Sequence, residues 1–270
     1  MVAQLSHTEL ERFGVPLPPG TLAWGIRRGP AFATILTACP LGAGDWGSEG
    51  FAGAEPSAKD AASLVEGASA GLTKVGGRVW LSFGTLPGFA LAGTLIMVEK
   101  APDTRGPVTD PPPPVLAEPA RVWGSPVSAP PLGEPGFAIL VRECQKGSLD
   151  FPEIPHVPDH MTLEPYKGQG TALWRRFIAP GSDDDGEEMG VVVLSAIDAS
   201  TAHLNFFGLK PAWRGRGLGE ALLREAIVLA GQRTLTAAVD SRNSPARALY
   251  KKLGFRETGT KTVMWKNLRG

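Results

Sequence analysis

The stretch that decides the fold reads PAWRGRGLGE and runs from Pro211 to Glu220. The residues just before it, 204–209 (LNFFGL), form a short apolar run rich in aromatic side chains, which is typical of a buried strand. The residues after it carry apolar side chains at helical spacing: Leu218, Ala221, Leu222, Ala226 and Leu229. The sequence therefore predicts a strand, a glycine-rich turn and a helix, in that order.

The glycines of this turn indicate a binding site for phosphate. Glycine reaches positive φ without strain, and it removes every Cβ atom near the start of the helix. The first backbone N–H groups of a helix have no partner within it, and they lie at the positive end of the helix dipole. Such a helix start binds phosphate or pyrophosphate. Arg214 and Arg216 add positive charge at the same place.

Two better-known phosphate loops do not fit this turn. A Walker loop needs Gly-Lys followed by Ser or Thr at the helix start, and the sequence contains no such triplet. The dinucleotide fingerprint needs Gly-x-Gly-x-x-Gly, whereas the glycines here are Gly215, Gly217 and Gly219.

The order Arg-x-x-Gly-x-Gly, from Arg214 to Gly219, resembles the acetyl-CoA pyrophosphate loop of the GNAT superfamily of N-acetyltransferases. A second block, residues 238–255, is similar to the part that follows in this family: a strand, an asparagine, a short helix carrying Leu-Tyr, and Gly-Phe before the last strands. The resemblance implies an α/β fold with a mixed, mostly antiparallel twisted sheet flanked by helices.

The same resemblance implies which residues contact acetyl-CoA. Backbone groups of the strand before the turn would hold the pantetheine arm and the thioester carbonyl, and the turn would hold the pyrophosphate. The implied contact residues are Phe207, Gly208, Leu209, Arg214, Gly215, Arg216, Gly217, Leu218, Gly219, Glu220 and Asn243. The resemblance implies no metal in this site.

Tyr250 stands seven residues after Asn243, which is the family's spacing for the tyrosine that protonates the departing thiolate. The alternative for Tyr250 is a helix tyrosine packed under the sheet. Asn243 is also suited to start the short helix as its N-cap, with Pro245 in the first turn, and this cap is its alternative role.

The general base is less clearly indicated. Some family members that act on protein N-termini have a glutamate on the strand before the asparagine, but Ala238 stands there in this chain. Other members have a glutamate at the start of the strand before the turn, and that position is His203. An imidazole with a pKa near 6.5 can take a proton from an ammonium, directly or through water. An ordinary strand histidine is the alternative.

The composition is that of a soluble globular protein. The chain has 270 residues, with 27 Lys and Arg balancing 27 Asp and Glu, so no overall field favours nucleic acid or an anionic membrane. Two cysteines, Cys39 and Cys144, provide neither a disulfide framework nor a metal cluster. The first residues lack the pattern of a signal peptide. We expect a cytoplasmic protein without nucleic-acid or membrane partners, whose oligomeric state the sequence leaves open.

The first hundred residues predict a small unit of strands and one helix. Strands are expected at 22–26, 31–36, 78–83 and from Gly88 onward, and a helix at 61–72, whereas the glycine-rich stretch from Cys39 to Ala54 is expected to be a loop.

The first half resembles a degenerate copy of the second. Residues 88–100 align with 254–266, the helix 61–75 with 218–232, and the strand 78–84 with 233–239. Chance similarity of amphipathic segments is the alternative. The place of the phosphate turn is taken by residues 53–60, which hold an acid and no arginine. We therefore expect three parts: a degenerate GNAT-like domain (1–100), a proline-rich linker (101–136) and the GNAT domain (137–270).

The second half predicts further elements around the turn. Strands are expected at 121–123, 137–142, 171–178, 190–197, 203–209 and 234–239, a short helix near 159–167, and a final hairpin over 255–268. The acidic stretch 182–188 is a solvated turn or an attraction for a cationic acceptor.

The resemblance implies an N-acetyltransferase that moves the acetyl group of acetyl-CoA to a primary amine by direct attack in a ternary complex. A CoA-binding or regulatory module without turnover is the alternative, and a scaffold acting through the proline-rich linker is a third. The acyl group can differ, and the acceptor is either a small molecule or a peptide.

Overall fold

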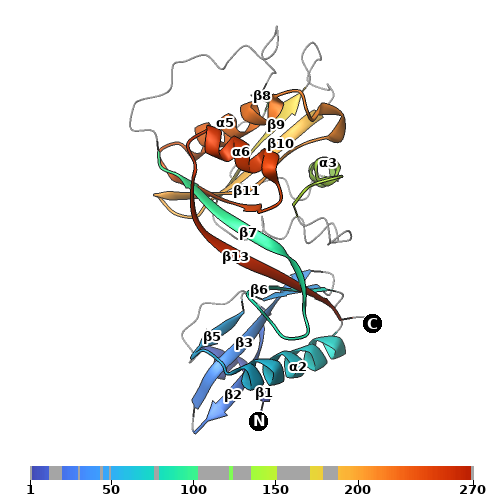
Figure 1. Ribbon diagram of the computed structural model, residues 1–270, viewed down its shortest axis with the longest axis vertical. Coiled ribbons are helices and arrows are strands. Elements are labelled where there is room, and N and C mark those ends of the chain that lie inside the picture. The colour runs from blue at the N-terminus through green and yellow to red at the C-terminus, as the bar shows by residue number, and fades with distance from the viewer. Residues whose placement is uncertain are drawn as a thin grey trace. The chain divides into compact units, whose positions relative to one another are not determined.

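The structure is a computed structural model, and it describes residues 2–11, 20–29, 31–42, 45–48, 50–75, 79–102, 122–123, 135–150, 171–178 and 188–268 (Figure 1). The chain forms two compact units. The first comprises Met1–Thr94 with Lys261–Gly270, and the second comprises Leu95–Thr260.

The first unit is a sheet with one long helix packed on it. Its elements are β1 (Val2–Gln4), α1 (His7–Glu11), β2 (Leu22–Arg28), β3 (Ala31–Gly42), β4 (Asp45–Ser48), β5 (Phe51–Gly53), α2 (Ala58–Val75) and β6 (Val79–Phe83). The apolar stripe of α2, which includes Leu64 and Leu72, packs against Trp24, Leu36 and Trp80. The expected helix and strands of this half are confirmed.

The expectation of a loop between Cys39 and Ala54 is wrong. The end of β3, all of β4 and all of β5 lie there. A glycine-rich stretch can still form strands, because the backbone of a glycine can pair with strands on both sides. Gly47 pairs with Cys39 on β3 and with Leu81 on β6. Trp46 is buried in the core of the unit.

The second unit has a mixed sheet in the order β7-β12-β11-β10-β9-β8, with one parallel pair, β11 and β12. Its elements are β8 (Val122–Trp123), α3 (Pro135–Gln145), β9 (Thr171–Ile178), β10 (Glu188–Ala196), β11 (Thr201–Leu209), the 3-10 helix η2 (Pro211–Trp213), α5 (Leu218–Ala230), β12 (Thr234–Asp240) and α6 (Ser244–Lys252). Two further strands, β7 (Ala90–Lys100) and β13 (Arg256–Asn267), each have residues in both units. This confirms the expected mostly antiparallel sheet and the predicted strand, turn and helix.

Helices cover both faces of this sheet. Apolar residues of α5, such as Leu222 and Leu223, pack against Val192 and Leu204 on one face. On the other face, Leu140 and Cys144 of α3 pack against Val193. Among the described residues, no helix is both long and apolar enough to cross a membrane.

Two predicted elements of the second half are corrected. Residues 137–142, expected as a strand, belong to α3, because a short apolar run has no period that separates the two structures. The helix has one buried side: Leu140 and Val141 are enclosed while Ile139 is exposed. The final hairpin is instead one continuous strand, β13. The predicted helix near 159–167, and all of the acidic stretch 182–188 except Glu188, lie outside the described residues.

The aligned strands of the two halves are exchanged between the units. β7 leaves the first half to pair with β12, and β13 completes the first unit by pairing with β6. The registers correspond residue by residue under the alignment of the sequence: Lys100 pairs with Leu235, and the equivalent Lys266 pairs with Trp80. An alignment produced by chance would not reproduce a register, so the first half is a degenerate copy of the second.

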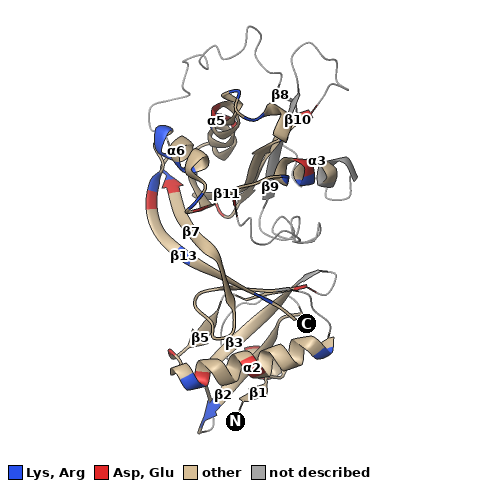
Figure 2. Cartoon of the chain, turned by 45° about the vertical axis from the view of Figure 1, so that its right-hand side comes forward, with Lys and Arg blue, Asp and Glu red and all other residues tan. Residues whose placement is uncertain are grey.

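Charged residues of both signs are spread over each unit (Figure 2). In the described part of the chain, no three His, Cys, Asp or Glu side chains gather as a metal site requires.

Candidate active site

A β-bulge in β11 sets which side chains face the site. Val193 of β10 pairs with Phe206, but the next residue, Leu194, pairs with Leu204, so Asn205 is an extra residue. The bulge turns Phe206 toward α3 and Phe207 toward α5 and α6.

The parallel ladder between β11 and β12 is short. It runs from Thr201 opposite Thr234 to Leu204 opposite Ala237, and the described pairing ends there although both strands continue. From Asn205 onward, the side of β11 that faces β12 is no longer bonded to that strand. Backbone N–H and C=O groups on such an edge can bind an extended ligand.

The glycine-rich turn opens α5 without a side-chain cap. Gly215 and Gly217 have φ values of +73° and +78°, and Gly217 is the N-cap of the helix. Because glycine has no side chain to accept from the first N–H groups, these donors are left for another acceptor. The turn lies beside α6: a Cβ atom built on Gly219 would be 3.5 Å from the side chain of Leu249.

The charged residues of the turn have different surroundings. The Arg214 guanidinium donates to the carbonyl oxygens of Leu209, Cys144 and Gly147 at 3.0, 2.8 and 3.1 Å. These bonds tie the turn to the C-terminal end of α3, where carbonyl groups lack helical partners. Arg216 is exposed, with its guanidinium 4.7 Å from the centre of the Trp213 ring.

Glu220 lies in the first turn of α5 and forms ion pairs on both sides. Its carboxylate accepts from Lys252 at 2.5 Å and from Arg224 at 2.8 Å. These two partners hold the pKa of Glu220 below its usual value. They also offset the repulsion that a carboxylate would exert on a phosphate at the same helix start.

Asn243 and Tyr250 lie at the start and near the end of α6. The Asn243 Oδ1 atom accepts from the backbone N–H of Ala246 at 3.2 Å, which confirms the predicted cap. Tyr250 is 3% exposed. Its ring packs edge to face against Phe207, at 5.8 Å between centroids, and against Phe255, at 5.0 Å.

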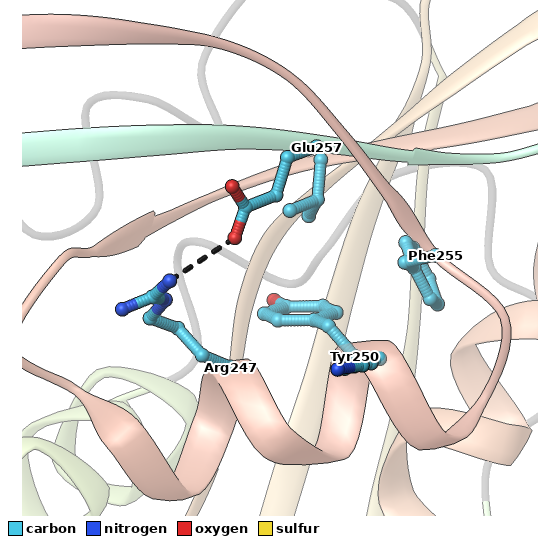
Figure 3. A pocket seen from close by; sticks show the side chains of 6 residues that line it. Arg247, Tyr250, Phe255 and Glu257 are labelled. Carbon is cyan, nitrogen blue, oxygen red and sulfur yellow. Dashed lines mark hydrogen bonds and ion pairs between the residues drawn. The ribbon is translucent and has the colours of Figure 1, made fainter.

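Burial raises the pKa of the Tyr250 hydroxyl far above its ordinary value, and the negative charge of Asp150 raises it further. The phenol therefore keeps its proton at neutral pH. A cavity of about 290 Å³ lies against this tyrosine and is lined by Val98, Arg247, Tyr250, Lys251, Phe255 and Glu257. Figure 3 shows Arg247 and Glu257 pointing toward one another there, 3.1 Å apart.

His203 lies on the opposite face of the sheet from Tyr250, on the side of α3, next to Ser195 of β10 and Thr236 of β12. Its Nδ1 atom is 2.9 Å from the Thr236 hydroxyl oxygen. Burial lowers the pKa of His203 below its ordinary value of 6.5. The structure thus brings Phe207 and Tyr250 together, whereas His203 lies on the other face of the sheet.

Asp150 was not predicted from the sequence. Its Oδ1 atom accepts from the backbone N–H of Asp240 at 3.0 Å, at the end of β12 where the ladder to β11 has opened. Partial burial of the carboxyl group raises its pKa, although the Asp240 N–H and the Asn243 side chain bond to it. Nothing local distinguishes this acid from other acids near the surface.

Residues 150–255 match the model of the family described as "Acetyltransferase (GNAT) family". The matched part, which carries α5, α6 and Tyr250, is thus similar to a GNAT acetyltransferase domain.

Individual similar proteins agree with this assignment. Over 80 residues, 30% of the chain, it is 34% identical to the peptidyl-lysine N-acetyltransferase YjaB of Salmonella typhimurium and spans half the length of that protein. A tandem GNAT protein from the clavulanic acid biosynthesis pathway superposes with a TM-score of 0.57 at 16% identity, covering 94% of this chain and 85% of that one. A GNAT acetyltransferase from Sphaerobacter thermophilus gives 0.59 at 16% identity, covering 98% and 86%. At this identity the two structures show the fold alone.

Proposed function

We propose that the protein is an acetyl-CoA-dependent N-acetyltransferase that acts on a primary amine by direct attack in a ternary complex. One observation carries the proposal: the uncapped start of α5 and the buried Tyr250 lie on the same face of the sheet, where the ladder between β11 and β12 ends.

Acetyl-CoA fits this arrangement in three parts. The N–H groups of the turn from Gly215 to Gly219 bind the pyrophosphate, with Arg216 adding charge. The free edge of β11 at Phe207 and Gly208 binds the pantetheine arm and polarises the thioester carbonyl. Arg214 contributes by fixing the turn to α3, since its guanidinium already donates to three carbonyls.

The two faces of the sheet separate the two proton transfers. His203 takes a proton from the acceptor ammonium, and the neutral amine forms the C–N bond at the thioester carbon. The C–S bond breaks, and the departing sulfur takes the Tyr250 proton. The attacking nitrogen loses its second proton to solvent, and solvent returns one to Tyr250. Solvent also removes the proton from His203, so the products are the amide, CoA with its free thiol and one released proton.

The acceptor is proposed as a primary amine of a small molecule or a peptide. The Salmonella relative, whose name says that it acts on peptidyl-lysine, makes a lysine-containing peptide the first acceptor to test. We further propose that the protein works in the cytoplasm. A CoA-binding module without turnover is the competing function, and it is favoured by Ala238 at a position where some members carry a glutamate.

The proposal is tested by calorimetric titration of the full chain with acetyl-CoA, followed by free-thiol release against a panel of amines. Arg216→Ala should weaken acetyl-CoA binding. Arg142→Ala, which removes an exposed arginine of α3 outside the turn, should not. Thiol release with one class of amine supports the enzyme. Binding without release for any amine supports the binding module, and no binding overturns both.

A further inference from the structure

We propose that Thr236 is a positioning residue that holds His203 with the proton on Nδ1, which leaves Nε2 as the nitrogen that accepts a proton from the acceptor amine. The assignment of His203 as the base rests on the proposed function. The hydrogen-bond arrangement itself can be tested without any activity.

The hydrogen bonds of Thr236 carry the inference. Its hydroxyl oxygen lies 2.9 Å from His203 Nδ1 and 3.2 Å from the backbone carbonyl oxygen of Ala202. A carbonyl oxygen only accepts, so the single hydroxyl hydrogen must point to Ala202 for that bond to exist. The hydrogen between Thr236 and His203 then belongs to Nδ1, and Nε2 carries the lone pair.

This arrangement serves both charge states of the imidazole. When Nε2 gains a proton, Nδ1 still donates to Thr236 and Thr236 still donates to Ala202, so no group reorients. The opposite arrangement, with the hydroxyl donating to Nδ1, would require the hydroxyl to turn around whenever His203 became charged. In that arrangement the single N–H proton of the neutral imidazole would be on Nε2, so His203 could not act as a base at that atom.

The strand register makes Thr236 the neighbour of His203. The two residues are partners in the parallel ladder, and both lie on the α3 face of the sheet, two positions away from Thr201 and Thr234. Ser195 flanks His203 on β10, and its hydroxyl is buried without a partner among the described residues.

Few titratable groups lie near His203 on this face. Glu99 of β7 pairs with Thr236, so it lies in line with His203 across the sheet. Its carboxylate accepts a hydrogen bond from Arg256 at 2.5 Å. Cys144 of α3 packs on the same face beside Phe206, and burial raises the pKa of its thiol to about 12, so it is neutral. Within the described residues, the proton position on His203 is therefore set by Thr236.

The test is long-range proton–nitrogen NMR of the full chain labelled with nitrogen-15 in histidine, at a pH where His203 is neutral, with His203→Gln to assign the signals. The wild type should show Nδ1 protonated. Thr236→Ser keeps the hydroxyl and should keep this state, whereas Thr236→Val keeps the shape, removes the acceptor and should release the proton to a mixture of both nitrogens. Thr234→Val, on the same strand and face, is the matched control and should change nothing.

A wild-type spectrum with the proton on Nε2 overturns the proposal, as does an unchanged tautomer in Thr236→Val. If that variant does not fold, Thr236→Ala takes its place. The wild-type spectrum alone still shows which ring nitrogen of His203 carries the proton. In turnover, Thr236→Val should lower kcat/KM about tenfold with KM for acetyl-CoA unchanged, as part of the roughly 10²- to 10⁴-fold that a general base contributes. Thr236→Ser should restore it. Failure of every amine to react contradicts the proposed function, and leaves the tautomer result standing.

Discussion

The ring of Phe207 on β11 meets the ring of Tyr250 on α6 edge to face, with 5.8 Å between their centroids. The two residues meet because the extra residue Asn205 turns Phe207 from the α3 face toward α6. The contact helps to fix the tyrosine beside the opened ladder of β11 and β12, while His203 remains on the other face. The proposed base and the proposed acid thus lie on opposite faces of the sheet.

The two arginines of the turn should respond differently to substitution. Arg214→Ala removes a guanidinium that donates to three carbonyls, and it should lower the free energy of unfolding by about 2 kcal/mol. Arg216→Ala should change that free energy by no more than about 0.5 kcal/mol, since the residue is exposed, but it should weaken acetyl-CoA binding. Urea unfolding and calorimetric titration of both variants measure the two effects. An equal loss of stability in the two variants would contradict a structural role for Arg214 and a binding role for Arg216.

Asp150→Asn should stabilise the protein at neutral pH. A carboxyl whose pKa is raised in the folded state prefers to be protonated there, so it costs stability above that pKa and costs nothing below the ordinary value near 3.8. Thermal unfolding should therefore give a higher Tm for Asp150→Asn at pH 7.5, with the difference shrinking as the pH falls toward 3.8. A lower Tm at both pH values would show that the bond from the Asp240 N–H outweighs the burial of the charge.

The rate should depend on pH through His203. Burial lowers the pKa of this imidazole, so the neutral form that can accept a proton persists to a pH below 6.5. With one amine substrate, kcat/KM of the wild type should fall on acidification through a pKa below 6.5. His203→Gln should lose this step and react roughly 10²- to 10⁴-fold more slowly. Since the amine ionises equally in both reactions, an identical pH profile for the two proteins would remove His203 from the mechanism.

The exchange of strands predicts a selective effect of shortening the chain. A chain ending at Thr260 lacks the part of β13 that pairs with Val79–Phe83 of β6. Amide hydrogen exchange should accelerate in β6 and leave β12 protected, because β12 keeps its partner in β7. A chain ending at Leu268 is the control and should match the full chain. Equal protection of β6 in both chains would mean that the pairing contributes little.

The sequence predicts those parts whose signals are local. The turn from Pro211 to Glu220, the helix α5 and the Asn243 cap all follow from residues within one or two helical turns of each other. The apolar run at 137–142 is too short to show whether its apolar residues follow a helical or a strand period, so the expectation of a strand there is wrong. The glycine-rich sequence around Gly47 predicts a loop, because a glycine pattern does not show that the backbone pairs with strands on both sides.

The unpredicted parts of the site depend on strand register. Thr236 reaches His203 only through the parallel pairing of β11 and β12, and Asp150 reaches the Asp240 N–H across a separation of ninety residues in the chain. No local pattern encodes either contact. The exchange of β7 and β13 is equally non-local, although the aligned Gly-Phe and Lys positions indicated the repeat on which it rests.

Acetyl transfer itself is tested most directly by measuring formation of the acetylated amine and of free CoA thiol by the wild type and by Tyr250→Phe, at saturating acetyl-CoA. We expect equal amounts of both products from the wild type, and for Tyr250→Phe a kcat lowered by roughly 10²-fold or more with unchanged acetyl-CoA affinity. Full activity in Tyr250→Phe, or a wild type that binds acetyl-CoA and acetylates no amine, would contradict this expectation.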